Sequence, residues 1–181
     1  DYLVDLFGEV SFISGLKDME ISSTSDVLYL PGGYVETDEV APILDKATQF
    51  KQSLRNFAQH PSKKIFAECA GLIFLGNNIQ TTYGSSIKGA NILSIDFEIG
   101  KKRNRLGYYK AIDNKTFSLF NGHAFHYSNP VNINEKKTPV RWGLFKKDDT
   151  KAQHGGWSSF QGNVFGTYLH SFFFNQPEIA L

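Results

Sequence analysis

Two apolar runs in the first half of the chain predict buried strands. Residues 26–30 and 63–66 are short segments that end in apolar side chains, which is typical of strands buried in a parallel sheet. A third apolar run, 72–75, begins soon after the second strand and predicts a helix. Because strands and helices alternate in this way in domains with a parallel sheet, the pattern predicts the α/β class.

The longest helical pattern lies between these two strands. Apolar residues recur at helical spacing from Val40 to Ala58, and Thr37 or Asp38 stands where an N-cap is expected. His60-Pro61 ends the pattern, since proline does not continue a helix. We therefore expect one helix between the strands.

The rest of the chain is less regular. Alternating apolar and polar positions in the second half are typical of antiparallel strands. A strand within 161–170 would deliver a histidine to its end, and a final helix is expected at 171–181. The other expected elements are a helix at 2–7, a strand at 10–13, and strands at 108–112, 124–127 and 140–145.

Length, charge and cysteine usage limit the function classes. A chain of 181 residues is expected to form one domain with a full core. The net charge of +1 gives no general attraction to nucleic acid or to an anionic membrane, and no apolar run is long enough to span a bilayer. A single cysteine excludes an internal disulfide and favours the reducing cytoplasm. Because the sequence opens at Asp1 directly in periodic sequence, we interpret it as part of a longer protein.

The single cysteine, Cys69, lies between the second predicted strand and the helix that follows. Its neighbours in Ala67-Glu68-Cys69-Ala70-Gly71 include small residues, as at a nucleophile elbow, where a strained turn lifts the reactive atom clear of the sheet. A helix beginning beside the sulfur favours thiolate over thiol. The alternative is a buried structural cysteine, since free cysteines are among the most buried residues.

Two further features are expected beside Cys69. Pro31-Gly32-Gly33-Tyr34 marks a turn at the end of the first strand, and ligands of parallel sheets bind beyond the carboxyl ends of strands. His170, at the end of a predicted strand, is the candidate base for the thiol. These signals together favour a catalytic cysteine.

The other histidines have weaker cases. His60 and His154 lie in polar loops, where solvation is the simplest interpretation. His123 and His126 are three residues apart, which places them on opposite faces of a strand and argues against a paired metal site. The sequence therefore predicts no bound metal.

Four motifs occur along the chain, at 31–36 (Pro-Gly-Gly-Tyr-Val-Glu), 67–72 (Ala-Glu-Cys-Ala-Gly-Leu), 122–128 (Gly-His-Ala-Phe-His-Tyr-Ser) and 166–170 (Gly-Thr-Tyr-Leu-His). In this order they resemble the glutaminase domain of the cobyrinic acid a,c-diamide synthases. That family belongs to the class I glutamine amidotransferases of the cobyric-acid-synthase type. The resemblance covers nearly the whole chain, so it implies one domain over residues 1–181. It also implies a flavodoxin-like fold, with a mostly parallel sheet and helices on both faces.

The resemblance implies a role for each motif. Cys69 would attack the side-chain amide of glutamine, and His170 would activate the thiol and protonate the departing ammonia. Backbone N–H groups of the Gly32-Gly33-Tyr34 loop and of Ala70 would bind substrate and stabilise the oxyanion. No cofactor is expected in this chain.

The same resemblance implies a larger enzyme. Ammonia would amidate the a and c carboxylates of a corrin in an ATP- and Mg-dependent synthase domain, which would precede Asp1. The whole protein would be an ATP-dependent ligase of cobalamin biosynthesis, and this chain alone would hydrolyse glutamine at most. Its partners would be glutamine and, with the missing domain, the corrin. A homodimer is left open as the oligomeric state.

Three features depart from the family pattern. Ala70 stands where the family usually has glycine, and a positive φ costs alanine more free energy than it costs glycine. Phe172 stands where many class I enzymes have a glutamate, which implies a Cys–His dyad without the usual orienting group. The chain also contains no Gly-x-x-x-x-Gly-Lys-Ser/Thr phosphate loop, in agreement with a missing ATP-binding domain.

The remaining special residues have two interpretations each. Glu36 and the segment from His123 through His126 and Tyr127 would face the tetrapyrrole or the missing domain, or else would hold loops together by hydrogen bonds. The basic run at 101–105 would attract an acidic corrin or, as we favour, is simply exposed. Phe172, Phe173 and Phe174 are expected in the core and at the domain interface.

Three alternative functions are left open by the sequence. A close relative of the leading hypothesis would act on nickel sirohydrochlorin or another acceptor. Another Cys–His hydrolase, such as a peptidase or a lipid II-type amidotransferase, would use the same elbow. A non-catalytic binding domain on the same fold would carry an unreactive Cys69.

Overall fold

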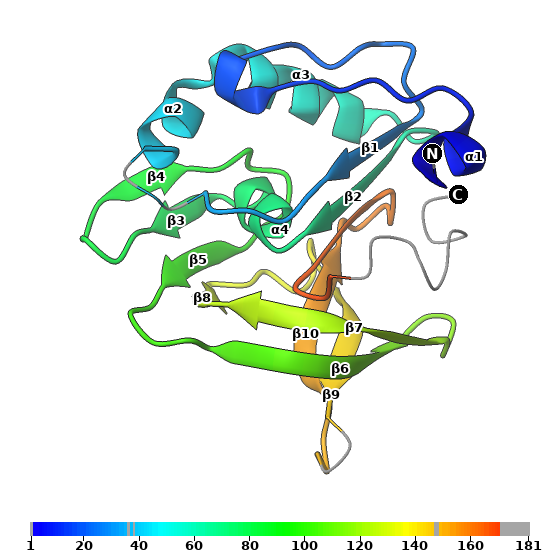
Figure 1. Cartoon of the computed structure of the whole chain (residues 1–181), viewed down its shortest axis with the longest axis vertical. Helices are drawn as coiled ribbons and strands as arrows, with labels where there is room; N and C mark the ends of the chain where they lie inside the picture. Colours follow the sequence, from blue (N-terminus) through cyan, green and yellow to red (C-terminus); the bar gives the residue numbers. More distant parts are fainter. Residues whose placement is uncertain (1, 36, 38, 147–148, 171–181) are drawn as a thin grey trace.

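A computed structural model of the chain describes all residues except 1, 36, 38, 147–148 and 171–181. Two sheets carry the fold: a seven-stranded sheet in the order β1-β2-β11-β10-β9-β6-β7 and a four-stranded sheet in the order β4-β3-β5-β8. The first half of the chain supplies the described helices, which lie on the upper side of Figure 1, and the second half is mostly strand. The predicted α/β class is confirmed.

Three parallel strands form the part of the large sheet that carries the elbow. They are β1 (Val27–Leu30), β2 (Lys64–Glu68) and β11 (Val164–Thr167). Strand β2 lies in the middle, with its Ala67 opposite Leu30 of β1 and Gly166 of β11. All three strands point the same way, so the segments that follow them leave from one edge.

The large sheet continues in antiparallel pairs, so it is mixed rather than mostly parallel. Beyond β11 come β10 (Gln153–Ser158), β9 (Val140–Phe145), β6 (Arg105–Asp113) and β7 (Leu119–His126). Each of these strands pairs antiparallel with its neighbours. Figure 1 shows that this half turns away from the plane of β1 and β2, so the sheet is strongly twisted.

The smaller sheet joins the large one through Tyr127. It consists of β4 (Ser86–Lys88), β3 (Asn78–Gln80), β5 (Asp96–Ile99) and β8 (Ser128–Val131). Strand β7 ends at His126 and β8 begins at Ser128, so the chain passes from one sheet to the other across a single residue. This crossing holds the motif at 122–128 between the two sheets.

Helices α3 (Thr48–Gln59) and α4 (Ala70–Leu75) are neighbours, with Phe50 stacked on Phe74 at 5.8 Å between ring centroids. Helix α4 contacts β1, β2 and β11. Within the described chain, these two helices lie on one side of the parallel strands. The opposite side carries a row of rings at centroid distances from 4.5 to 6.1 Å: Tyr29, Phe66, Phe165, Trp142 and Phe120.

The helix expected between β1 and β2 is two helices, α2 (Ala41–Lys46) and α3. Ala47 breaks the pattern because its ψ of 73° leaves the helical region. Asp45 accepts a hydrogen bond from the Lys88 N–H at 2.7 Å. This bond holds α2 against β4, so α2 does not continue in line with α3. The N-cap expected at Thr37 is wrong: the N-cap of α2 is Val40, without a side-chain cap, and Thr37 accepts a hydrogen bond from the Val40 N–H at 3.3 Å, before the helix begins. Asp38, the other candidate, lies outside the described residues.

Of the two elements expected at the start of the chain, the helix forms and the strand does not. Helix α1 (Tyr2–Phe7) forms and ends at Gly8, whose φ of 79° suits glycine. The strand expected at 10–13 is wrong: in the structure these residues pair with no strand and lead to a short 3₁₀ turn, η1 (Gly15–Lys17). The helix expected at 171–181, with its Phe172, Phe173 and Phe174, lies outside the described residues.

Gly71 allows α4 to lie close on β1. A Cβ added at Gly71 would meet the Leu30 carbonyl oxygen at 2.5 Å and the Leu30 Cβ at 2.7 Å.

We predict that Gly71→Ala destabilises the protein by about 1–3 kcal/mol, because the added Cβ would force the strand backbone or the helix to move. Urea unfolding measures the change. Gly33→Ala is the matched control, since its Cβ would meet only the Ala70 Cβ at 3.9 Å, and an equal loss in both variants would contradict this reason.

Candidate active site

Cys69 sits on a strained turn between β2 and α4. Its backbone has φ 48° and ψ −101°, a combination that L-residues rarely adopt. The turn is held on both sides: the Cys69 N–H donates to the Thr167 carbonyl at 2.8 Å, and the Cys69 carbonyl accepts from the Ile73 N–H at 3.0 Å. The side chain is buried, with 6% of the residue exposed. The geometry is that of the predicted nucleophile elbow.

Small residues beside Cys69 make room for the turn. Gly71 lies against Leu30, and a Cβ on Gly166 of β11 would meet the Leu72 Cδ1 at 2.7 Å. Ala70 is the first residue of α4, and the positive φ belongs to Cys69 itself. The concern about alanine at position 70 therefore falls away, because this position needs no left-handed backbone.

His170 is held in place by pairing with β7. Its backbone N–H donates to the His123 carbonyl at 2.8 Å, and the His123 N–H donates to the His170 carbonyl at 3.3 Å. Residues after β11 are fixed as well, since the Tyr168 N–H donates to the Gly155 carbonyl at 2.8 Å. The edge of the large sheet therefore positions the predicted base.

The loop after β1 lies against both reactive residues. Gly32 packs on the His170 imidazole so closely that an added Cβ would overlap the ring. Gly33 lies beside Ala70, the first residue of α4. The N–H groups in the first turn of a helix have no acceptor within the helix, so the Ala70 N–H can bind a ligand. The two regions proposed to supply oxyanion N–H groups are thus neighbours.

A cavity of about 120 Å³ brings the predicted residues together. Cys69 and His170 line it, with Gly33 and Tyr34 from the loop after β1. Gly32 lies behind His170. The other lining residues are Ile73, Ile99, Phe125, His126, Tyr127 and Ser128. Glu36, which the sequence marked for the acceptor or the domain interface, lies outside the described residues.

The motif at 122–128 forms a wall of this cavity. The Cys69 thiol lies 3.7 Å from the Phe125 carbonyl oxygen, which accepts its hydrogen bond. His126 stacks on Tyr168 at 3.6 Å between centroids, and its Nδ1 lies 3.0 Å from the Ser128 carbonyl oxygen. His123 and His126 point to opposite faces of β7, as predicted: His126 is buried, and His123 contacts the Tyr108 ring edge-on. No pattern in the sequence indicated that Phe125 is a neighbour of the thiol.

Glu68 is a second residue whose contacts the sequence did not predict. Its side chain is buried at the end of β2, and its Oε2 lies 3.8 Å from the His170 Nδ1. The same oxygen accepts a hydrogen bond from the Tyr29 hydroxyl at 2.8 Å. The only sequence signal was its position next to the nucleophile.

Burial determines the protonation states around the cavity. Desolvation lowers the pKa of His170 below 6.5, although Glu68 opposes the shift and His123 adds to it. Desolvation, together with the charge of Arg105, lowers the pKa of His126 to about 4. Burial, helped by Glu68, raises the pKa of Tyr29 well above its ordinary value. His170 is therefore neutral near pH 7, as a base must be.

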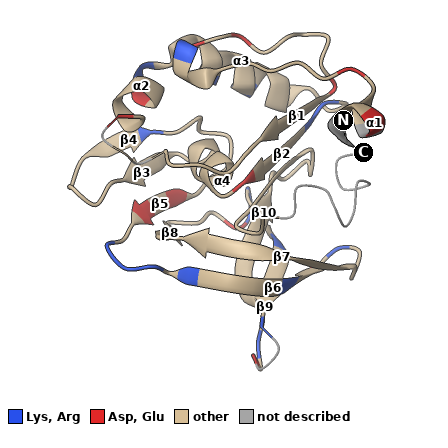
Figure 2. Cartoon of the chain, viewed as in Figure 1, with Lys and Arg blue, Asp and Glu red and all other residues tan. Residues whose placement is uncertain are grey.

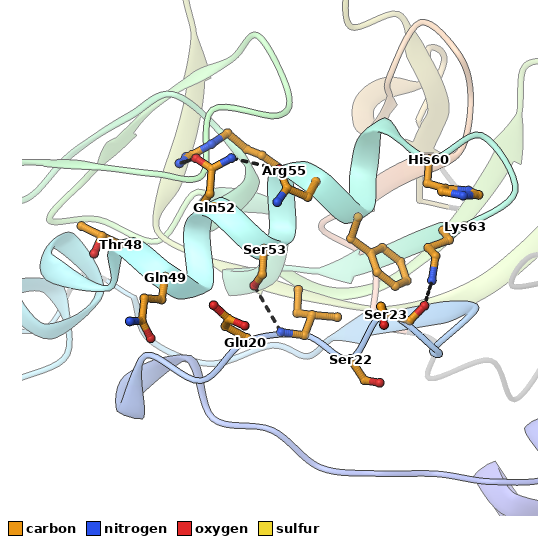
Figure 3. A pocket seen from close by; sticks show the side chains of 13 residues that line it. Glu20, Ser22, Ser23, Thr48, Gln49, Gln52, Ser53, Arg55, His60 and Lys63 are labelled. Atoms are coloured by element: carbon orange, nitrogen blue, oxygen red, sulfur yellow. Dashed lines mark hydrogen bonds between the residues drawn. The ribbon is translucent and has the colours of Figure 1, made fainter.

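A larger cavity lies elsewhere. It has a volume of about 790 Å³ and runs between α3 and the segment around Ser22, where Lys63 donates to the Ser23 carbonyl (Figure 3). Its walls are mostly polar, and neither Cys69 nor His170 lines it. His60 at its rim is exposed, as expected, with its Nδ1 3.0 Å from the Ser62 hydroxyl. Size alone therefore does not mark the reactive site.

The basic run at 101–105 is mostly solvated, as favoured from the sequence. Lys101, Lys102 and Arg103 are exposed, and Figure 2 shows basic residues in the connection that enters β6. Arg105 differs: it is half-buried, lies 6.0 Å from the centroids of the Tyr109 and Tyr168 rings, and donates to the His154 carbonyl at 2.8 Å. The exposed part of the run is therefore 101–104.

Neither a metal site nor a membrane span emerges from the described part of the chain. No group of three His, Cys, Asp or Glu side chains there is placed to hold a metal ion. Within the same residues, no helix combines the length and apolar character needed to cross a bilayer.

Comparison with protein families identifies one matching model, the CobB/CobQ-like glutamine amidotransferase domain, over residues 2–178. Similar curated proteins include the cobyrinate a,c-diamide synthases of Methanococcus vannielii (31% identity over 99% of the chain) and Salmonella typhimurium (32% over 84%). The hydrogenobyrinate a,c-diamide synthase of a Sinorhizobium species is 29% identical over 90% of the chain. The chain spans 38%, 33% and 36% of these three relatives, respectively.

Solved structures agree on the fold. A crystal structure of a glutamine amidotransferase superposes with a TM-score of 0.60 at 19% identity, covering 86% of this chain and 75% of that one. PurLQS from Thermotoga maritima superposes with a TM-score of 0.62 at 14% identity, covering 90% of this chain and 79% of that one. At such identities the likeness concerns the fold alone. It confirms the expected glutamine amidotransferase fold, except that the large sheet is mixed and not mostly parallel.

The strained backbone of Cys69 leads to a stability prediction. Cys69→Ala keeps the Cβ and its strain, whereas Cys69→Gly removes both. Strain of this kind costs about 1–3 kcal/mol, and the extra freedom of unfolded glycine offsets up to about 1 kcal/mol of the relief. We expect Cys69→Gly to be about 1–2 kcal/mol more stable than Cys69→Ala in urea unfolding. Equal stabilities would show that the turn carries no strain.

Buried His126 leads to a prediction for the pH dependence of stability. Its folded pKa of about 4 lies below the ordinary 6.5, so the unfolded chain takes up the proton first as pH falls. The free energy of unfolding should decrease as the pH falls from about 6.5 to about 4, and this group should contribute on the order of 3 kcal/mol to the decrease. His126→Gln should reduce that decrease in urea unfolding, and exposed His60→Gln should not. The prediction fails if both variants follow the native pH dependence.

Proposed function

Since the chain belongs to the CobB/CobQ-like glutamine amidotransferase family, we propose that it hydrolyses glutamine and releases ammonia by Cys–His chemistry. The observation that carries this proposal is the small cavity at the end of the parallel strands. Its walls join Cys69 on a strained turn, neutral His170, and Gly33 beside the start of α4. These parts match the needs of acyl transfer: a nucleophile, a base and oxyanion donors.

Glutamine hydrolysis begins at the Cys69 sulfur. His170 takes the thiol proton, and the thiolate forms a bond to the side-chain amide carbon of glutamine. The N–H groups of Ala70 and Gly33 stabilise the resulting oxyanion. When the carbon–nitrogen bond breaks, His170 returns the proton to the leaving nitrogen, and ammonia departs.

A thioester between Cys69 and the glutamyl group remains. Water attacks its carbonyl carbon while His170 takes a water proton, and the returning proton restores the thiol as glutamate leaves. The small size of the cavity, about 120 Å³, suits the end of one side chain rather than a macrocycle. We therefore assign glutamine, and not the acceptor, to this cavity.

The acceptor of the ammonia is proposed from the relatives. Proteins named cobyrinate a,c-diamide synthase match nearly the whole chain, while the chain covers 38% or less of their length. We propose that a synthase part outside this chain uses ATP and Mg²⁺ to activate the a and c carboxylates of a cobyrinate-type corrin. The domain at 1–181 is then the ammonia source. The cytoplasm is the proposed location, because the reaction needs a reduced thiol.

An electrophilic glutamine analogue tests the glutamine site directly. We predict that 6-diazo-5-oxo-norleucine adds once to the full-length protein, at Cys69. Its ketone is held like the glutamine amide carbonyl, and the diazo carbon takes the place of the amide nitrogen. Once that carbon is protonated, the thiolate forms a bond to it and dinitrogen leaves. Excess glutamine should suppress the adduct, and Cys69→Ser should abolish it. Intact-mass spectrometry with peptide mapping gives the measurement.

Two outcomes would contradict the proposed function. Labelling of Cys69 that glutamine does not suppress would indicate a different Cys–His hydrolase. No labelling of the full-length protein under conditions where iodoacetamide modifies Cys69 would indicate a reactive thiol without a glutamine site.

A further inference from the structure

Glu68 is a buried carboxylate directly before the nucleophile. The residue is 2% exposed, and it ends β2 on the same face as Phe66. Burying a carboxylate costs free energy unless donors or charges compensate it. The partners of Glu68 therefore indicate why the position tolerates an acid.

One carboxylate oxygen serves two partners. Oε2 accepts the Tyr29 hydroxyl at 2.8 Å and lies 3.8 Å from the His170 Nδ1. The raised pKa of Tyr29 keeps the phenol protonated, so it remains a donor. Tyr29 thereby fixes the carboxylate at a point from which its charge faces the imidazole.

The imidazole has little freedom to turn. Gly32 packs against its Cε1 and Nδ1 edge, and the His170 backbone is paired with His123. Nδ1 is the ring nitrogen beside Glu68, and the His170 side chain lines the same cavity as Cys69. If Nδ1 is the nitrogen that Glu68 holds, Nε2 is the one left to accept the thiol proton. A base must be oriented in this way to accept the thiol proton.

We propose that Glu68 is the positioning residue of this site: its carboxylate orients His170 through Nδ1 and stabilises the imidazolium formed when Cys69 is deprotonated. This inference rests on the proposed glutaminase function. It replaces the Cys–His dyad with a Cys–His–Glu arrangement in which the acid comes from the strand before the nucleophile. The position two residues after the histidine carries Phe172, which has no carboxylate.

The charges around His170 set the direction of the expected effect. Glu68 favours the protonated imidazole, while His123 on β7 and burial disfavour it. His126, which also belongs to β7 and lines the same cavity, has its own pKa lowered in part by His170. Removing the Glu68 charge therefore leaves only groups that oppose protonation of His170.

The competing explanation is that Glu68 only anchors Tyr29. Both roles predict lost stability when Glu68 changes, so stability cannot separate them. The pKa of His170 can separate them. If Glu68 only anchors Tyr29, removing its charge should leave the pKa of His170 unchanged, whereas removing the charge of the proposed partner should lower it. Tyr29→Phe is the matched variant, because it removes a hydrogen bond to the same oxygen but keeps the carboxylate charge.

The experiment compares Glu68→Gln, Glu68→Asp and Tyr29→Phe with the native full-length protein. We expect Glu68→Gln to move the acid limb of kcat/KM for glutamine hydrolysis to lower pH, and to reduce the plateau on the order of 100-fold through kcat. KM should change little, since Glu68 acts through His170. Glu68→Asp should retain the native position of the acid limb, and Tyr29→Phe should not move it to lower pH.

A second measurement needs no glutamine. NMR titration of the His170 ring in the same variants should give a lower pKa for Glu68→Gln than for the native protein and for Tyr29→Phe. An unchanged His170 titration would overturn the proposal, even if activity fell, because the loss would then be structural. If the native protein failed to hydrolyse glutamine while the His170 shift appeared, the glutaminase function would fail and the Glu68–His170 coupling would stand.

Discussion

The close packing of α4 on the parallel strands is the constraint on which the site depends. Gly71 lies against the Leu30 backbone, and Leu72 lies over Gly166. All six residues of α4 are buried, and fully burying one large apolar side chain contributes about 1.5–3 kcal/mol. That burial offsets the strain of about 1–3 kcal/mol in the Cys69 turn. The helix cannot relax away from the sheet, so the thiol stays at its end.

The curl of the mixed sheet completes the site. The parallel strands present Cys69 and the Gly32-Gly33 loop, but the wall opposite comes from β7 at the far edge. The curl brings that edge back, so that His123 pairs with His170 and the Phe125 carbonyl reaches the thiol. Cys69 and His170, the proposed nucleophile and base, are thus fixed by one continuous sheet, and burial lowers the pKa of His170. Glu68 is buried beside His170, and a buried carboxylate needs hydrogen-bond donors or positive charges to compensate for the lost water.

Local patterns predicted the elements that are long or strongly marked. Strands β1, β2, β6, β7 and β9 and helix α1 follow from apolar runs, alternation and a terminal glycine. Missed elements have other causes. Strands β3 and β4 are too short to show a period, and the break at Ala47 depends on Asp45 binding β4. Residues 10–13 have the composition of a strand, but they pair with no strand of the two described sheets.

The sequence by itself determined the residues on which the proposed chemistry depends: one thiol among small residues, a glycine turn after a strand and a histidine after another. These are local requirements, because an elbow or a tight turn admits few residue types at each position. Only the tertiary structure decided what faces the thiol and the base. Phe125 is 56 positions from Cys69, and Tyr29 is 39 from Glu68. Contacts at such separations depend on strand order and on the curl of the sheet, which no local pattern encodes.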